Sequence, residues 1–598
     1  MFHERHHKIT MLESTIQQKV NHWLDGKYDN ETKETIKKMS ENDLTDAFYK
    51  DLEFGTGGLR GLMGVGTNRM NRYTVGAATQ GLSNYLKKSF PNLKKGEISV
   101  AIAFDSRTNS PEFADIVADI FSSNGIKVFL FSSLRPTPEL SFAIRHLGCK
   151  SGVVLTASHN PKEYNGYKAY WEDGGQVVEP HDENIIKEVE SIKSIDEIKF
   201  ERNADLVEKI DTEIDKIYIS QLINSLADDK TKEVIKRQSD LSIVYTPLHG
   251  TGITLIPQVL EELGFKNVHI VEEQAISDGN FPTVVYPNPE ESEAMTLALK
   301  KAKQVNADVV MATDPDADRV GIAVKNKEGE FVLMNGNQTF ALLVAYNLEA
   351  WKNANKLNGN QMVIKTIVTT ELIKEITQKY GVNIYDTLTG FKHIAALIET
   401  KKQENPKNGI QEEFILGGEE SYGYLIGDKV RDKDGIASCA SIALLAAYAK
   451  DKGFSLFEWL IEIYKEYSFY LEELVSITKK GQQGAAQIEE MMKTFRENPP
   501  KMLANSNLLE VYDYKNQTIL DVQKGISKAM ETNLPKSNVL AFYTEDGSKI
   551  SMRPSGTEPK IKFYFSVKEN LDTTENYEKV KKDLQDKIQK QIADLGIN

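Results

Sequence analysis

Ser158 stands where an apolar, β-branched run ends, in the segment VVLTASHNP that covers residues 153–161. A hydroxyl at the carboxyl end of a strand is either part of a turn or a reactive group. A Ser/His hydrolase would carry its serine in a GxSxG turn, whereas this segment contains TASHN. Successive side chains diverge in an extended chain, so His159 is not expected to be the base for Ser158. Two interpretations remain for Ser158: a turn residue, or a serine that carries phosphate.

Another strand-like run, residues 308–313, is followed by carboxylates at every second position. Asp314, Asp316 and Asp318 repel one another unless a cation lies between them, and hard oxygen ligands suit Mg²⁺ or Ca²⁺. An EF-hand is excluded, because a loop that begins at Asp314 lacks the glycine at position six and the glutamate at position twelve. A short loop that leaves coordination positions open favours Mg²⁺ that also binds a phosphate oxygen. The alternative is a solvated acidic turn.

The segment MRPSGTEPK at residues 552–560 combines the groups that hold a dianionic phosphate: hydroxyls, a guanidinium, an ammonium and a glycine turn with free N–H groups. The candidates are Arg553, Ser555, Gly556, Thr557 and Lys560. Pro-Ser-Gly-Thr is also an ordinary turn, so this segment alone is a moderate signal.

Two further glycine-rich segments carry polar groups. FILGGEESYGYLIG at 414–427 places Glu419, Glu420 and Ser421 after an apolar run. Paired carboxylates and a hydroxyl can bind the vicinal hydroxyls of a sugar, and the alternative is a solvated turn. EFGTGGLRG at 53–61 is neither a Walker A loop, because it lacks the GK[ST] ending, nor a GxGxxG dinucleotide turn. By itself it indicates no function.

The elements that must position these groups are short apolar strands, usually followed by helical patterns. Their spacing predicts α/β units with mostly parallel sheets. The predicted strands form three sets: 98–104, 126–131 and 151–156; 241–246, 268–273 and 308–313; and 362–370, 382–387 and 412–418. The tail differs, because residues 538–567 predict an antiparallel pair around an EDGS turn, and apolar steps from Tyr577 to Ile592 predict a closing amphipathic helix. Most candidates therefore stand at strand ends, where open α/β sheets bind ligands.

The bulk properties exclude several classes of protein. A chain of 598 residues suggests roughly three to five domains. With 73 Lys+Arg against 87 Asp+Glu, the formal net charge of -14 argues against a nucleic-acid binder. Cys149 and Cys439 form no CxxC, which argues against a disulfide framework or a thiolate metal site. The start lacks a secretory signal, and the longest small and apolar run, 436–449, is shorter than the ~20 residues of a membrane span. We therefore expect a cytoplasmic protein without a membrane partner, in which 436–449 is a buried helix.

Four motifs in order, TASHNP, DPDADR, GEES and RPSGTEP, resemble those of the α-D-phosphohexomutases, and in particular the phosphoglucomutase/phosphomannomutase group. The resemblance covers roughly residues 45–570. It implies an α/β fold of four domains: three related α/β domains around a cleft and a C-terminal α+β domain. The expected limits are a helical extension 1–44 and domains 45–205, 206–328, 329–470 and 471–598. We expect connectors at the charged stretch 193–215 and the helical stretch 470–498, the latter as a hinge.

The resemblance also implies a role for each candidate. Ser158 would carry the catalytic phosphoryl group and complete, through its phosphate, a Mg²⁺ site formed by Asp314, Asp316 and Asp318. The other catalytic positions would be Lys168, Arg60, Arg319, His159 and Lys392. Lys168 matches a position often assigned general acid/base work, and we expect burial and the two arginines to lower its pKa. The sugar and its non-reacting phosphate would be held by Gly418, Glu419, Glu420, Ser421, Lys392, Arg553, Ser555, Gly556, Thr557 and Lys560.

The implied activity is that of a Mg²⁺-dependent phosphoglucomutase, which interconverts glucose 1-phosphate and glucose 6-phosphate through a phosphoserine and glucose 1,6-bisphosphate. The sugar loop GEES is closer to the glucose-handling pattern than to GEMS or GEQS. The alternatives are a phosphomannomutase or phosphopentomutase, a phosphoserine-using sugar phosphatase, and a non-catalytic sugar-phosphate sensor. The sensor is disfavoured because all the implied catalytic positions are filled. The expected partner is a hexose monophosphate, and the expected state is a monomer or homodimer.

Overall fold

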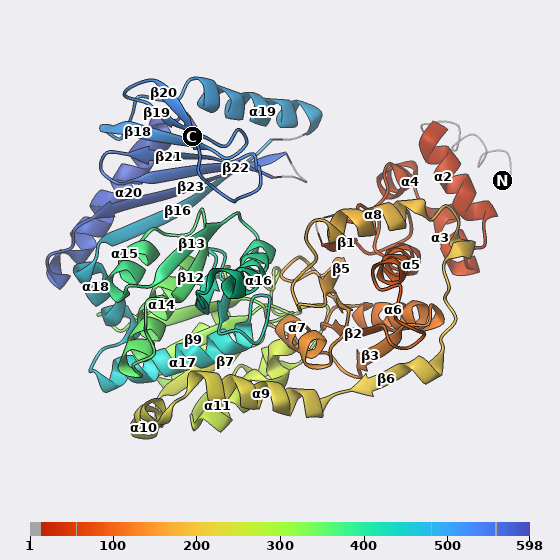
Figure 1. Ribbon diagram of the computed structural model, residues 1–598, viewed down its shortest axis with the longest axis horizontal. Helices are drawn as coiled ribbons and strands as arrows, with labels where there is room; N and C mark the ends of the chain where they lie inside the picture. Colours follow the sequence, from red (N-terminus) through yellow and green to blue (C-terminus); the bar gives the residue numbers. More distant parts are fainter. Residues whose placement is uncertain (1–13, 56, 480, 556–558, 598) are drawn as a thin grey trace.

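A computed structural model of the protein describes residues 14–55, 57–479, 481–555 and 559–597. Its chain forms four sheets in succession, with the N-terminal helices and the fourth sheet at opposite ends of the molecule (Figure 1). Three sheets are mixed and mostly parallel at their centres, and the fourth is antiparallel. This confirms the predicted α/β fold with a distinct C-terminal domain.

The first sheet has six strands in the order β1-β5-β4-β2-β3-β6. Its strands are β1 (Gly58–Leu62), β2 (Ser99–Phe104), β3 (Lys127–Phe131), β4 (Ser151–Leu155), β5 (Tyr164–Trp171) and β6 (Val207–Ile210). Strands β3, β2 and β4 are parallel neighbours, as their apolar β-branched sequences predict. The associated helices are α5 (Arg72–Ser89), α6 (Ser110–Ser123), α7 (Thr137–His146) and α8 (His181–Ser191).

Three N-terminal helices precede this sheet: α2 (Ser14–Asp25), α3 (Asn30–Lys38) and α4 (Glu41–Phe48). Their apolar faces pack together, and Trp23 and Phe48 bury against Tyr73 of α5. The predicted helical extension is thus a small helical layer against the first sheet's domain, within the residues that the structure describes.

The second sheet has the order β11-β10-β9-β7-β8. Its strands are β7 (Ser242–Thr246), β8 (Asn267–Ile270), β9 (Val309–Thr313), β10 (Val320–Lys325) and β11 (Phe331–Met334). Around it lie α9 (Thr212–Leu226), α10 (Asp229–Arg237), α11 (Ile256–Leu263), α12 (Glu272–Ala275) and α13 (Thr296–Val305). Strand β9 lies at the centre of the order, beside β7 and β10, so the loop after it is covered on both sides.

The third sheet has the order β13-β12-β14-β15. Its strands are β12 (Gln361–Thr366), β13 (Asn383–Thr387), β14 (Glu413–Gly418) and β15 (Tyr424–Ile426). Its helices are α14 (Gly336–Asn353), α15 (Leu372–Tyr380), α16 (Phe391–Asn408), α17 (Gly435–Asp451) and α18 (Leu456–Glu466). Helix α17 contains the apolar run at 436–449 and is buried nearly all round, as predicted.

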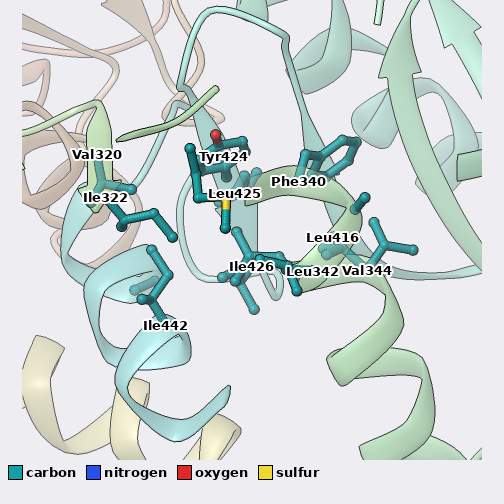
Figure 2. Packing of buried hydrophobic residues seen from close by; sticks show 14 of the residues in the cluster. Val320, Ile322, Phe340, Leu342, Val344, Leu416, Tyr424, Leu425, Ile426 and Ile442 are labelled. Atoms are coloured by element: carbon teal, nitrogen blue, oxygen red, sulfur yellow. The ribbon is translucent and has the colours of Figure 1, made fainter. Parts of the chain in front are cut away.

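The second and third sheets share one core. Figure 2 shows Ile322 of β10, Leu425 of β15 and Ile442 of α17 facing the same apolar space. Helix α14 contributes Leu342 to this cluster. Because these residues are buried together, the second and third sheets are fixed relative to each other.

The fourth sheet is antiparallel, with the order β16-β23-β22-β21-β18-β19-β20 and β17 beside β18. Its strands are β16 (Phe469–Thr478), β17 (Met502–Leu503), β18 (Ser506–Asp513), β19 (Thr518–Asp521), β20 (Ile526–Ala529), β21 (Leu540–Thr544), β22 (Lys549–Pro554) and β23 (Lys560–Glu569). Helices α19 (Gly481–Glu497) and α20 (Tyr577–Asp594) accompany it. Strands β21 and β22 form the predicted antiparallel pair around EDGS.

Both predicted connectors contain strands. Within 193–215, residues Val207–Ile210 form β6, which pairs in parallel with β3. Within 470–498, the helix α19 is preceded by β16, which pairs with β23 along its whole length. The prediction of a helical stretch across 470–498 is therefore wrong for β16, in which Glu472 and Glu473 interrupt the apolar residues of the strand.

Candidate active site

Ser158 lies just beyond the carboxyl end of β4 and is 3% exposed. Its φ of 52° is left-handed, and its N–H donates to Thr156 Oγ1 at 2.8 Å. Ser158 Oγ donates to Asp314 Oδ2 at 2.8 Å and lies 3.1 Å from His159 Nδ1. The expected divergence of the Ser158 and His159 side chains is therefore wrong here, because the left-handed residue is not extended.

His159 belongs to the same turn and lines a cavity that residues of all four domains border, called the main cavity below. Burial, with the positive charges of Arg319 and Arg60, lowers the pKa of His159 well below its usual value. At neutral pH the imidazole is therefore uncharged. Because the single hydroxyl proton of Ser158 is donated to Asp314, the contact of 3.1 Å requires the tautomer in which Nδ1–H donates to Ser158 Oγ.

The carboxylates of Asp314, Asp316 and Asp318 follow the central strand β9 and are fully buried. One oxygen of each lies within 4.8 Å of the others. Asp314 Oδ1 accepts the N–H groups of Asp318 and Arg319 at 3.2 and 3.1 Å, so the loop turns around this side chain. Among the described residues, Asp316 Oδ1 and Asp318 Oδ1 have no hydrogen-bond partner although both are buried. Buried oxygens without partners are unfavourable unless a cation or water binds them, and the predicted metal loop fits a hard divalent ion.

Two of the three carboxylates have pKa values that are shifted in opposite directions. Burial raises the pKa of Asp314 well above its usual value, and the negative charges of Asp316 and Asp318 raise it further. For Asp318, burial is outweighed by Lys433, Lys168 and Arg319, which lower its pKa. The loop therefore carries more negative charge than its surroundings stabilise in the absence of a cation.

Lys168 projects from β5 onto the metal loop. Its Nζ lies 2.7 Å from Asp316 Oδ2 and 3.3 Å from Asp318 Oδ2. Burial alone would lower the pKa of Lys168, but these two carboxylates outweigh it and raise the pKa. The expected lowering is wrong, because the nearest charges are acidic and the arginines are not the dominant neighbours.

Lys433 was not anticipated from the sequence. It lies between Asp432 and Asp434 in the loop before α17, and its Nζ is 2.9 Å from Asp318 Oδ2. Burial would lower its pKa, but the carboxylates of Asp318, Asp432 and Glu419 raise it. The alternating acids in DKD repeat the spacing of the metal loop, which was the available signal.

Of the three remaining catalytic candidates, Arg319 lines the main cavity, whereas Arg60 and Lys392 do not. Arg319 lines the cavity and pairs with Glu290 at 2.6 Å. Arg60 is exposed on β1, which pairs with β5, and its Nη1 lies 3.5 Å from Asn160 Oδ1 in the serine turn. Lys392, at the start of α16, lies 3.8 Å from Asp182 Oδ2 and is not among the residues that line the cavity.

The expected sugar loop follows β14. Glu419 Oε1 accepts the N–H of Gly390 at 2.9 Å, and Glu420 Oε2 accepts the hydroxyls of Thr366 and Thr369 at 3.3 and 3.4 Å. Burial and the charge of Glu419 raise the pKa of Glu420 to about 7. Gly418 is the buried last residue of β14, and Ser421 lines the cavity beside the two glutamates.

The expected phosphate loop joins β22 to β23. Arg553 and Lys560 line the main cavity, and Ser555 N–H donates to Lys560 O at 2.7 Å across the base of the loop. Gly556 and Thr557 lie outside the described residues. Lys562 and Lys549 of the same two strands also line the cavity and were not anticipated.

All four domains border one cavity of about 720 Å³. The first domain contributes His159, the second Arg319, the third Glu419 and the fourth Arg553. The buried Ser158 and Asp314 are not among the lining residues, but Ser158 contacts His159 and Asp314 accepts the N–H of Arg319. A serine, an acidic cluster, two further carboxylates and several cations therefore meet around one cleft. This arrangement defines a class of enzyme that moves phosphoryl groups on a polyhydroxylated substrate.

The comparisons with known proteins identify this class. Four family descriptions match in order: phosphoglucomutase/phosphomannomutase alpha/beta/alpha domain I at 51–196, domain II at 216–329, domain III at 335–467, and the C-terminal domain at 491–580. The chain belongs to the phosphoglucomutase/phosphomannomutase family, an isomerase family.

Curated relatives match nearly the whole chain. A phosphoglucomutase of Staphylococcus haemolyticus is 37% identical over 568 residues, which cover 94% of this chain and 98% of the relative. A phosphoglucomutase of Staphylococcus epidermidis is 34% identical over 555 residues, with 92% and 96% covered.

Solved structures share the fold. A putative phosphomannomutase of Thermus thermophilus has a TM-score of 0.63 at 20% identity and covers 90% of this chain and 99% of its own. The open form of a Paramecium phosphoglucomutase has a TM-score of 0.68 at 19% identity, with 92% and 96% covered. Within the part of the chain that the structure describes, each helix is too short or too polar to cross a bilayer.

Proposed function

We propose that the protein is a Mg²⁺-dependent phosphoglucomutase, which interconverts glucose 1-phosphate and glucose 6-phosphate through phosphorylated Ser158 and glucose 1,6-bisphosphate. The observation that carries this proposal is the hydrogen bond of 2.8 Å between Ser158 Oγ and Asp314 Oδ2. It joins a hydroxyl at the end of β4 to the acidic loop after β9, two segments of different domains. A turn serine with no chemical role has no need of a buried carboxylate cluster beside it.

Ser158 would act as a phosphate carrier. In the first half of the reaction its Oγ–P bond breaks and a P–O bond forms to the free hydroxyl of the hexose monophosphate, which gives up its proton to a basic group of the cleft. The resulting bisphosphate turns around, and its other phosphoryl group returns to Ser158 Oγ. The product is the isomeric monophosphate, and the enzyme is phosphorylated again.

Asp314, Asp316 and Asp318 would hold Mg²⁺, and the two buried oxygens without partners support this assignment. A bound Mg²⁺ supplies charge that stabilises the phosphoryl group during transfer. Lys168, which contacts Asp316 and Asp318, would add positive charge to the region of the transferring phosphoryl group. Arg319, held by Glu290, presents a permanent charge to the same region.

The sugar and the second phosphate would lie further along the cleft. Glu419, Glu420 and Ser421 offer acceptors to the sugar hydroxyls, and Arg553 with Lys560 offers a fork and an ammonium to the non-reacting phosphate. The names of the curated relatives favour glucose over mannose or pentose phosphate.

The phosphoserine is tested by intact-mass analysis of the purified protein. We expect a fraction heavier by one phosphoryl group, which peptide mapping places on Ser158 and which disappears in Ser158→Ala. The exposed Ser191→Ala variant is the control and should keep that fraction. A phosphate that maps to another residue would contradict the mechanism.

The substrate is tested by coupled assays with the 1-phosphates of glucose, mannose, glucosamine and ribose, together with free-phosphate detection. We expect the highest kcat/KM for glucose 1-phosphate, with glucose 1,6-bisphosphate shortening the initial lag. Equal turnover of ribose 1-phosphate would favour a phosphopentomutase, and stoichiometric release of phosphate would favour a phosphatase.

A further inference from the structure

Arg107 is a fully buried cation that the proposed mechanism does not use. It lies in the loop after β2, is 1% exposed, and is not among the residues that line the main cavity. Its only close carboxylate among the described residues is Asp105, whose Oδ2 lies 3.4 Å from Arg107 Nε. A buried charge is costly unless hydrogen bonds satisfy it, so the other partners of this guanidinium indicate its purpose.

Those partners are four main-chain carbonyls of the serine turn. Arg107 Nη2 donates to the carbonyl oxygens of Ser158, at 2.6 Å, and Asn160. Arg107 Nη1 donates to those of Pro161, at 2.8 Å, and Tyr164, at 3.0 Å. The two terminal nitrogens carry four N–H groups in one plane, and each meets a different carbonyl.

The turn needs such a restraint because its backbone is strained. Ser158 has a φ of 52°, a left-handed conformation that is unfavourable for a residue with a side chain. A strained conformation persists only where its surroundings over-determine it. While Arg107 binds the carbonyl oxygens of this turn, the Ser158 side chain is free to place Oγ against Asp314.

Contacts from two domains hold the Arg107 loop and its guanidinium. Asp105 Oδ1 accepts the main-chain N–H of Arg107 at 2.9 Å, which fixes the loop on the first sheet. Phe281 of the second domain lies over the guanidinium, 5.0 Å from ring centroid to Cζ. A Cβ at Gly279 would lie 2.3 Å from Thr108 N, so this segment of the second domain sits directly on the Arg107 loop.

We propose that Arg107 is a positioning residue that fixes the Ser158 turn and thereby aims the phosphate-carrying oxygen at the metal loop. The expected effect of Arg107 on kcat rests on the proposed function. Its structural role, to immobilise residues 157–164, does not depend on which reaction Ser158 carries out. A lysine at this position would keep the charge, but its three N–H groups radiate from one nitrogen and cannot reach four separated carbonyls.

The test compares Arg107→Lys with Arg202→Lys, a control on the surface of the same domain whose arginine pairs with Asp115 at 2.8 Å. Two quantities are measured well below the unfolding temperature of each variant: hydrogen exchange of the peptide that spans 157–164, and kcat and KM for glucose 1-phosphate. We expect faster exchange in this peptide with the rest of the first domain unchanged. We also expect kcat to fall by about 10²-fold, the effect of a misplacement near 1 Å, with KM within about threefold.

Other outcomes separate the two proposals. If the wild-type protein turns over no sugar phosphate, the proposed function fails, and the exchange measurement still decides the role of Arg107. If Arg107→Lys keeps wild-type exchange at 157–164 and wild-type kcat, or raises KM in place of lowering kcat, the inference is wrong.

If Arg107→Lys unfolds, which exchange throughout the first domain would show, Asp105→Asn decides. The amide oxygen of the Asp105→Asn side chain can still accept the main-chain N–H of Arg107, so this variant removes only the carboxylate charge beside Arg107 Nε. In Asp105→Asn we then expect faster exchange of the peptide 157–164, as predicted for Arg107→Lys, and a smaller loss of kcat, about tenfold. Unchanged exchange at 157–164 in Asp105→Asn would overturn the inference.

Discussion

The two ends of the cleft are built in different ways. At one end, Ser158 and the Asp loop of the second domain are buried. Arg107 of the first domain binds the serine turn, and Lys168 of the first domain and Lys433 of the third contact the carboxylates of the Asp loop. At the other end, Arg553 and Lys560 flank a loop between two strands and are only half-buried. The fourth domain contacts the third at two places: Phe457 of α18 packs against Tyr577 within the large core cluster, and Val368 packs with Tyr514, Val539 and Tyr564 in a smaller one.

The difference fits the proposed mechanism, in which the two ends have different tasks. Phosphoryl transfer is sensitive to the position of the attacked atom, so the reacting end benefits from a rigid, over-determined site. The non-reacting phosphate must be accepted from either end of a bisphosphate that turns around. A cradle on the fourth sheet can meet both orientations, provided that the contact between the third and fourth domains is firm enough to place it.

The largest expected effect comes from the reacting end. In Asp314→Asn the isosteric amide removes one charge from the metal loop, so kcat should fall by at least about 10³-fold. The stabilisation that added Mg²⁺ gives to the wild-type Tm should also disappear. Because burial and two neighbouring carboxylates already disfavour ionised Asp314, the metal-free variant should be no less stable than the wild type. A large loss of Tm without Mg²⁺ would contradict this account, and Asp521→Asn on the surface is the control.

The contact between the third and fourth domains should give the next largest effect. Glu371 Oε1 lies 2.6 Å from Lys549 of the fourth sheet and 3.1 Å from the buried Lys365. Glu371→Gln leaves both ammonium groups with less compensation, so the free energy of unfolding should fall by about 3 kcal/mol at pH 7. Thermal and urea unfolding measure this, and the exposed Glu578→Gln should leave both unchanged.

The pH dependence of that effect has a definite sign. Burial would raise the pKa of Glu371, but Lys365, Lys549 and Lys374 outweigh it and lower the pKa well below its usual value. A lowered pKa in the folded state stabilises the protein above the unfolded value of about 4.3, and this stabilisation is lost as the pH falls. The difference in Tm between wild type and Glu371→Gln should therefore be complete at pH 7 and shrink below about pH 4.5. A constant difference would show that Glu371 acts by packing alone.

A smaller effect is expected at the phosphate cradle. Arg553→Lys keeps the charge but loses the planar fork that binds two phosphate oxygens at once. KM for glucose 1-phosphate should rise about tenfold, with kcat within about threefold. The exposed Lys528→Arg on β20 is the control. A fall in kcat with unchanged KM would place Arg553 at the reacting end and would erase the contrast between the two ends.

The sequence predicted best those groups that follow directly after an apolar strand. Ser158 and the Asp loop were found because each stands directly after an apolar strand, and the order of such strands fixes where their carboxyl ends meet. Asp105 and Arg107 stand after the predicted strand 98–104 in the same manner, so the signal that identified Ser158 was available for them as well.

Other features depend on contacts between domains. Lys433 reaches Asp318 only because α17 packs between the second and third sheets, and no local pattern encodes that packing. The raised pKa of Lys168 depends on its two partners from the second domain. Strands β6 and β16 were predicted as connectors because charged residues interrupt their apolar alternation at a sheet edge.

The smallest effect is expected from Glu472 of β16, which lines the cleft on the side of the fourth sheet. Burial raises its pKa to about 7. A carboxyl with a raised pKa in the folded state loses stability as the pH rises from the unfolded value of about 4.3 toward 7, because the unfolded chain ionises first. Glu472→Gln removes that loss and should raise Tm at pH 8 by roughly 1–4 °C, with no gain at pH 4. Differential scanning calorimetry at both pH values measures this, with the exposed Glu569→Gln as the control. A gain of equal size at pH 4 would mean that the amide stabilises β16 by a route other than removal of the buried charge.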